Sequence, residues 1–122
     1  MRNILLNRIT GYVLVVLLML AGEVFAAELT QEKIVVLALG DSLTAGFGVD
    51  AEENFPSRLQ VKIDNAGLAY KVVNAGVSGD TTAGGVRRIN WLMKHKPQIV
   101  ILALGANDGL RGLSTEEMRS NL

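Results

Sequence analysis

The sequence predicts an α/β domain of three layers, α/β/α, in which helices cover both faces of a parallel sheet. Three apolar runs rich in β-branched residues, at 33–39, 70–75 and 98–104, have the composition of strands buried on both faces. Segments with helical periodicity separate them, and this alternation is typical of a parallel sheet with right-handed crossovers. A glycine-rich polar loop follows each run, at the edge where open sheets bind ligands.

Residues 1–26 have the features of a secretory signal peptide. Two arginines precede a short apolar run at 12–21, and small residues follow it. This order predicts cleavage after Ala26 or Ala27. The alternative is an uncleaved anchor, but the run is shorter than the ~20 residues that span a bilayer. We therefore expect a mature chain of residues 27–122, periplasmic or secreted, without stable membrane insertion.

The first strand is predicted at 33–39, where the sequence reads KIVVLAL. A helix is predicted from 55 to 66, because four apolar residues recur there at helical spacing. Pro56 suits the first turn of this helix and Gly67 suits its end. The four apolar residues are Phe55, Leu59, Ile63 and Ala66.

The second strand is predicted at 70–75 and the third at 98–104, with a helix between them. That helix places an apolar face opposite three basic residues, and Pro97 ends it. The apolar face contains Val86, Ile89, Leu92 and Met93, and the basic residues are Arg87, Arg88 and Lys94. A last helix begins near Ser114, because Ser114 and Glu117 form the Ser-x-x-Glu capping pattern.

The composition excludes several classes of protein. The chain has twelve basic and twelve acidic side chains, and without residues 1–26 it would keep ten and eleven. A net charge near zero gives no basic surface for a nucleic acid or an anionic membrane. The sequence contains no cysteine, so no disulfide stabilises the fold in an oxidising compartment. The residues left after signal cleavage are few for a three-layer domain.

Three polar loops follow the predicted strands, at 40–43, 74–80 and 105–109. The first contains a candidate nucleophile, Ser42, whose hydroxyl a tight turn after the strand would expose. Because the loops leave the same edge of a parallel sheet, we expect them to form one site.

The same loops contain groups that can donate hydrogen bonds to a developing oxyanion. Gly79 has no Cβ, so its N–H can approach a substrate closely. The Asn107 side-chain amide adds a donor without adding charge. With the Ser42 N–H, these residues would supply three donors to the transition state of an acyl transfer.

Each of these residues also has an ordinary structural explanation. Ser42 can cap a helix, Gly79 can provide a positive φ, and Asn107 can form a turn. Three aspartates of these loops are expected to accept loop hydrogen bonds and to take no part in catalysis. They are Asp41, Asp80 and Asp108.

The order of three sequence blocks resembles one enzyme family. The blocks are GDSLTAGFGV, VVNAGVSGDTTAGG and LALGANDGLRG. They are similar to the SGNH, or GDSL, hydrolases, and most of all to the periplasmic acyl-CoA thioesterase I, lysophospholipase and arylesterase group. The resemblance implies the flavodoxin-like SGNH hydrolase fold, with Ser42 as nucleophile and with Gly79 and Asn107 in the oxyanion hole. It implies hydrolysis of a small-molecule or lipid acyl ester or thioester, with no cofactor and no metal.

The sequence departs from this family in one block. Family members have a fourth block, Asp-x-x-His, that supplies the general base, and this sequence has none. The single histidine, His95, precedes the third strand, and at ~3.3 Å per residue that strand puts it roughly 20 Å or more from the loops. A base acts within about 3 Å or through one water. We therefore expect His95 to be a surface residue, and the chain to be the amino-terminal part of a hydrolase domain, truncated after the third strand.

Two other functions are weighed against hydrolysis. A nucleotide-binding α/β domain also has glycine-rich loops, but no Gly-x-Gly-x-x-Gly follows the first strand and no Gly-Lys-Ser/Thr occurs. A non-catalytic protein that keeps the pocket is the alternative if 122 residues are the whole product. Phe47, Val49 and Leu110 either line an acyl groove or pack ordinary loops. No sequence feature predicts a particular oligomeric state.

Overall fold

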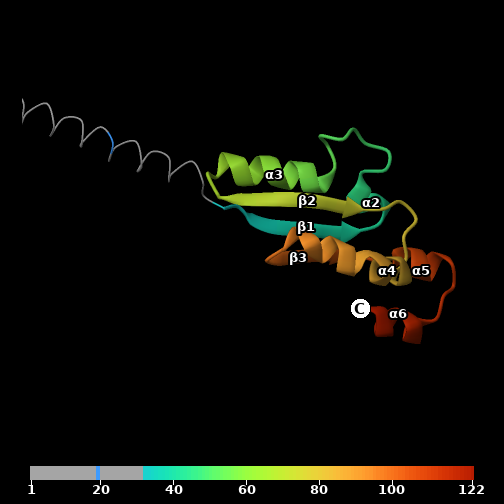
Figure 1. The fold of residues 1–122 in the computed structure, drawn as a ribbon. Helices are drawn as coiled ribbons and strands as arrows, with labels where there is room; N and C mark the ends of the chain where they lie inside the picture. Colours follow the sequence, from blue (N-terminus) through green and yellow to red (C-terminus); the bar gives the residue numbers. More distant parts are fainter. Residues whose placement is uncertain (1–18, 20–31) are drawn as a thin grey trace, which may run out of the picture. The chain divides into compact units, whose positions relative to one another are not determined.

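The computed structural model describes Met19 and residues 32–122 (Figure 1). The chain forms two units, Met1–Glu32 and Lys33–Leu122, and the sheet belongs to the second. The signal peptide predicted at 1–26 falls outside the described residues, apart from Met19, and stays a prediction. Among the described residues, no helix combines the length and the apolar character that crossing a bilayer requires.

Three parallel strands form the sheet, in the order β2-β1-β3. Their bounds are Ile34–Gly40 for β1, Tyr70–Gly76 for β2 and Ile99–Ala103 for β3. The last residue of β1, Gly40, lies level with Gly76 on one side and with Ala103 on the other. The three strands therefore end at one edge, and the loops that follow them begin there, as predicted.

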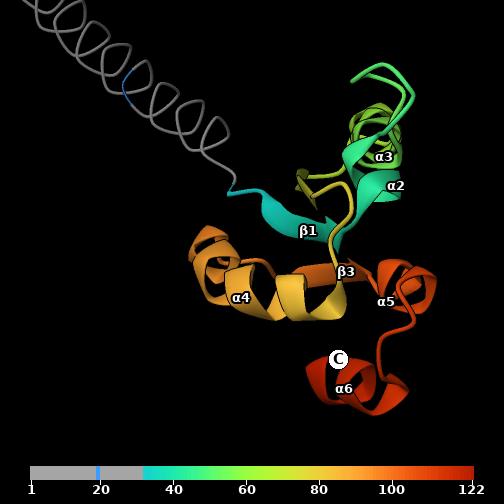
Figure 2. The same cartoon turned by 90° about the vertical axis from the view of Figure 1, so that its right-hand side faces the viewer.

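Helices lie on both faces of the sheet, which confirms the predicted three-layer fold (Figure 2). α3 (Phe55–Asn65) packs against β2 on one face, and α4 (Thr82–Leu92) lies on the other. The core contains Leu37 and Leu39 of β1, packed with Leu92 of α4. The remaining helices are short: α2 (Ser42–Ala45), η1 (Met93–His95), α5 (Ala106–Leu110) and α6 (Thr115–Asn121).

Capping residues set the beginnings of α3 and α6. The Asn54 side chain accepts the Ser57 N–H at 2.9 Å, with Pro56 in the first turn of α3. The Ser114 hydroxyl accepts the Glu117 N–H at 3.3 Å and caps α6. Both helices therefore begin where the sequence predicts them, because a side-chain oxygen satisfies a main-chain donor that the first turn leaves free.

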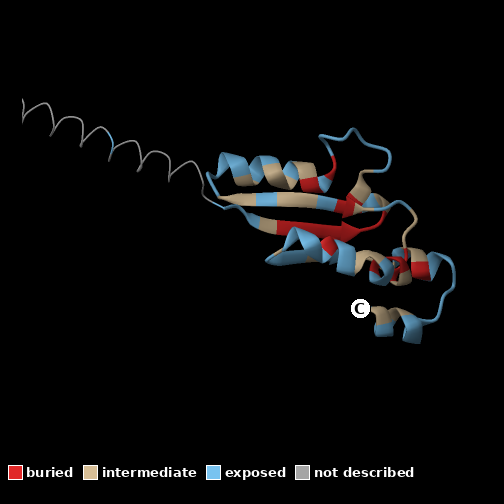
Figure 3. Cartoon of the chain, viewed as in Figure 1, coloured by how far each residue is buried: buried red, intermediate tan, exposed pale blue. Residues whose placement is uncertain are grey.

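The burial of the strands differs from the prediction. β1 is buried, with Leu37 and Ala38 fully enclosed, whereas Ile99, Val100 and Leu102 of β3 are 43%, 44% and 49% exposed (Figure 3). β1 lies between two strands, while β3 has a paired strand on one side only among the described residues. An apolar run therefore predicts a buried strand correctly at the centre of this sheet and incorrectly at its edge.

An apolar groove follows the face of β3 between α4 and α6. Its walls include Val86 and Ile89 of α4, Val100 and Leu102 of β3, and Leu122. Val86 and Leu122 are 47% and 60% exposed. The face of α4 that the sequence predicts to be buried is therefore divided between the core and this open groove.

Candidate active site

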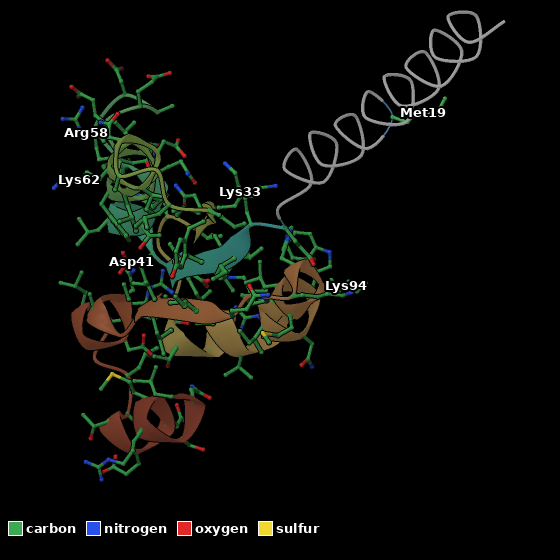
Figure 4. All side chains as sticks on the ribbon, turned by 90° about the vertical axis from the view of Figure 1, so that its left-hand side faces the viewer. Met19, Lys33, Asp41, Arg58, Lys62 and Lys94 are labelled. Atoms are coloured by element: carbon green, nitrogen blue, oxygen red, sulfur yellow. The ribbon has the colours of Figure 1, made fainter. Side chains whose placement is uncertain are left out.

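Ser42 begins the short helix α2, directly after β1. The Asp41 side chain caps this helix by accepting the Leu43 N–H at 3.0 Å, and only 5% of Asp41 is exposed. Asp41 follows the carboxyl end of β1, whereas Lys33 and Lys94 precede β1 and β3 and lie apart from it in Figure 4. Asp41 is thus a loop acceptor, as predicted. Ser42 is half-buried as the first helical residue, where a helix leaves its N–H groups without partners in the helix.

Two glycines permit the close approach of α2 to the strand ends. A Cβ on Gly40 would overlap the Thr44 side chain, and a Cβ on Gly76 would overlap the backbone of Ala45. The second contact is with main-chain atoms, which no rotamer change can relieve. Glycine at these strand ends therefore lets the helix that carries Ser42 lie against β2.

Gly79 lies in a turn after β2 with a φ of 79°, a left-handed conformation that suits glycine. The turn is closed by the Asp80 N–H, which donates to the Val77 carbonyl at 3.0 Å. The Gly79 carbonyl accepts a hydrogen bond from Arg111 Nη2 at 2.7 Å. Within the described part of the chain, no acceptor takes the Gly79 N–H, so this donor is available to a ligand.

Asn107 connects the loops that contain Ser42 and Gly79. It follows Gly105, whose φ is 115°, and lies in the first turn of α5. Its Nδ2 donates to the Asp80 carbonyl at 2.9 Å and to Asp41 Oδ2 at 3.4 Å. The amide therefore has acceptors within the chain, and the longer contact, with Asp41, is the weaker one.

Arg88 is the residue at this edge that sequence reasoning placed wrongly. The helical pattern assigns it to the basic face of α4, yet its side chain is only 20% exposed. Its Nε donates to Asp80 Oδ2 at 2.8 Å, and its terminal nitrogens donate to the main-chain oxygens of Gly40 and Ala75. The position in a helix shows which way a side chain leaves the backbone, but an arginine is long enough to turn back to the strand ends.

These three loops match a known family. Residues 38–122 match the GDSL-like Lipase/Acylhydrolase family. The chain belongs to that family. The match covers the whole sequence from the middle of β1 onwards, including the loops of Ser42, Gly79 and Asn107. The resemblance inferred from the three sequence blocks is thereby confirmed.

Relatives of this GDSL-like chain include named esterases. Esterase TesA of Pseudomonas aeruginosa is 40% identical over 108 residues, which are 86% of this chain and 54% of that protein. The arylesterase of Vibrio mimicus is 43% identical over 98 residues, which are 80% of this chain and 48% of that protein. The crystal structure of AlinE4, an SGNH-hydrolase family esterase, is similar with a TM-score of 0.69 and 46% identity, covering 75% of this chain and 50% of that one.

The chain spans about half the length of these GDSL-like relatives. The similar half contains β1, β2 and β3 with their loops, and the structural similarity confirms the SGNH hydrolase fold for this portion.

Asp108 holds α4 and α5 together beneath the site. It is 3% exposed, and its carboxylate accepts the Thr82 N–H at 2.9 Å and the Thr82 hydroxyl at 2.6 Å. The Thr82 hydroxyl lowers the pKa of Asp108 below its ordinary value of 3.8, against the opposing effect of burial. Asn121 Nδ2 donates to the same hydroxyl at 3.1 Å and ties α6 to this pair. Asp108, like Asp41 and Asp80, is therefore an acceptor that holds structure.

His95 lies at the other edge of the sheet from Ser42. It is the last residue of η1. Three residues later, the Gln98 N–H donates to the Val35 carbonyl near the start of β1. Its ring is exposed and meets Trp91 edge-on, with centroids 5.8 Å apart. The prediction of a surface histidine is confirmed. Within residues 32–122, no three acidic, histidine or cysteine side chains gather as a metal site.

Proposed function

We propose that this chain supplies the nucleophile and the oxyanion hole of an exported serine hydrolase that cleaves carboxylic esters or acyl thioesters. The observation that carries the proposal is the pair of Asn107 hydrogen bonds, which join the Ser42 loop to the Gly79 loop at one sheet edge. Membership of the GDSL-like family supports a hydrolase at this site.

Ser42 Oγ attacks the acyl carbonyl carbon and gives up its proton to a general base. The carbonyl oxygen becomes an oxyanion, which accepts hydrogen bonds from the N–H groups of Ser42 and Gly79. It also accepts the Asn107 Nδ2 hydrogen that makes the long contact with Asp41 in the free chain, while the shorter bond to the Asp80 carbonyl stays in place. The intermediate collapses, the alcohol or thiol leaves with a proton, and an acyl-enzyme remains on Ser42. Water then attacks the acyl-enzyme and releases the acid. These steps use only protein groups and water.

The general base is proposed to come from an Asp-x-x-His block beyond residue 122. The exposed face of β3 and the apolar groove beside it support this arrangement, because a larger domain would bury both. The chain's coverage of about half of its relatives supports it as well.

An acyl chain is the proposed occupant of the surface around Ser42. Phe47, Val49 and Leu110 lie in the loops after β1 and β3 and are 79%, 50% and 84% exposed. Packing among the described residues does not enclose these side chains, so they are free to contact an acyl chain. The names of the relatives, esterase and arylesterase, support an ester substrate.

Labelling of Ser42 tests the proposal. A fluorophosphonate probe applied to cell fractions should label the protein translated from the native gene, and the labelled band should lie in the periplasmic or secreted fraction. Ser42→Ala should abolish labelling, because the probe phosphorus bonds to Oγ. Ser78→Ala removes an exposed serine of the neighbouring loop and is the matched control, which should keep its label.

A binding protein that keeps the same pocket without turnover is the alternative. It predicts a folded native gene product that binds an ester analogue with no Ser42 labelling. That result would contradict the hydrolase, whereas labelling with release of acid would contradict the binding protein.

A further inference from the structure

We propose that Arg88 is a positioning residue for the oxyanion hole, and this inference rests on the function proposed above. The guanidinium group acts through the backbone segments that carry Ser42 and Gly79. Its three hydrogen bonds go to three separate segments of this sheet edge.

Two of these bonds hold the ends of neighbouring strands. Arg88 Nη2 donates to the carbonyl of Gly40 at 3.0 Å, two residues before Ser42, and Nη1 donates to the carbonyl of Ala75. The Gly40 carbonyl also accepts the Val77 N–H at 3.0 Å. The guanidinium group therefore fixes the end of β1 relative to the start of the loop that leads to Gly79.

The third bond connects Arg88 to the other two oxyanion donors, the Gly79 N–H and Asn107 Nδ2. Arg88 Nε holds the Asp80 carboxylate at 2.8 Å, and Asp80 directly follows Gly79 in the chain. The Asp80 carbonyl accepts Asn107 Nδ2 at 2.9 Å. A displacement of the Asp80 main chain would therefore move both the Gly79 peptide and the carbonyl that orients the Asn107 amide.

The geometry requires an arginine, and a positive charge alone would not suffice. Arg88 spreads three donors over three acceptors in a fixed plane, which an ammonium group on a flexible stem does not do. The ion pair with Asp80 is largely enclosed, with 20% and 11% of the two side chains exposed. Lysine at position 88 would keep the charge next to Asp80 but would lose at least one strand-end bond.

The test measures turnover of p-nitrophenyl butyrate by the native gene product and its variants. Arg88→Ala should lower kcat by about 100-fold and leave KM nearly unchanged, because misplaced oxyanion donors weaken the transition state more than substrate binding. Millimolar guanidinium chloride should restore part of the kcat of Arg88→Ala, whereas sodium chloride at the same concentration should not. Arg87→Ala, an exposed arginine on the same helix, is the matched control and should keep its kcat.

Arg88→Lys is the second variant, and it keeps the test usable if Arg88→Ala does not fold. It should give a wild-type circular dichroism spectrum with a kcat lowered at least 10-fold. A folded Arg88→Lys or Arg88→Ala variant with wild-type kcat would overturn the positioning role and leave the proposed hydrolase standing. A wild-type protein that neither turns over the ester nor is labelled at Ser42 would overturn the proposed function itself, and the positioning role with it.

Discussion

Thr44 and Thr82 are buried to the same degree but differ in their hydrogen bonds. Thr44 is 0% exposed and Thr82 is 1% exposed. The Thr82 hydroxyl donates to Asp108 and accepts from Asn121, whereas the Thr44 hydroxyl has no partner among the described residues. A buried hydroxyl without a partner costs free energy that a methyl group of the same shape would not.

Replacing each threonine by valine should therefore have opposite effects on the native gene product. Thr44→Val should raise the free energy of unfolding by about 1 kcal/mol, because it removes an unsatisfied polar atom and keeps the volume. Thr82→Val should lower it, because the Asp108 carboxylate loses its shortest hydrogen bond. Chemical denaturation at neutral pH compares the two variants, and equal effects would contradict this assignment.

The effect of Thr82→Val should also depend on pH. The folded-state pKa of Asp108 lies below its ordinary value, so the carboxylate stabilises the fold above about pH 4, and this contribution disappears as the pH falls through the folded-state pKa. The deficit of Thr82→Val should therefore be largest near neutral pH and should shrink in acid. Thr44→Val provides the control, since its effect should not follow the titration of Asp108.

The residues proposed to carry out the chemistry could be selected from the sequence, but the residue proposed to position them could not. Ser42, Gly79 and Asn107 each follow the end of an apolar run, so residue type and order were sufficient to propose them. Arg88 lies in a helix, and its role depends on carbonyl groups of Gly40 and Ala75 that are distant in sequence. The signal present in the sequence was Asp80, an acidic residue eight positions before Arg88.

At the scale of elements, the start of α4 is shaped by the Asp80 side chain. Gly84 lies in the first turn of this helix, and a Cβ there would overlap the Asp80 carboxylate. Glycine is a poor helix former, so its presence has a cost that ordinary helix positions avoid. The close contact explains why a side chain is not accommodated at this position.

Gly84→Ala should therefore slow the labelling of Ser42 by a fluorophosphonate about 10-fold or more, because it displaces the carboxylate that Arg88 holds. Gly109→Ala is the matched control, since Gly109 is also helical and a Cβ there meets nothing within 4 Å. The control should label at the wild-type rate. Equal labelling rates in both variants would contradict the role assigned to this contact.

The existence and type of the main elements followed from the sequence, while their burial did not. Asn54 and Ser114 cap the first turns of α3 and α6, and such helix beginnings can be recognised from the local sequence. The exposure of β3 depends on strand order, and three apolar runs of similar composition do not indicate which one is central. In a full capping box the Glu117 carboxylate would accept the Ser114 N–H. In α6 the carboxylate that bonds to Ser114 belongs to Glu116, which accepts the Ser114 hydroxyl.

At the scale of the whole molecule, the groove along β3 provides a test of what covers it. Leu102 on β3 is 49% exposed, and Val61 on α3 is 50% exposed. If the proposed larger domain buries β3, Leu102→Asp should lower the unfolding free energy of the native gene product by about 3 kcal/mol or more. Val61→Asp, at an equally exposed position, should change it by about 0.5 kcal/mol or less. Similar small effects at both positions would contradict a covered β3.

The strand order β2-β1-β3 also affects how the sheet is completed during synthesis. The first strand to leave the ribosome is the central one, and its pairing with β3 joins Val36 to Ile99, 63 residues later. Contacts of this sequence separation form slowly, because a long loop must close before they contribute. β1 is thus made first among these strands, and one of its edges stays unpaired until β3 has been made.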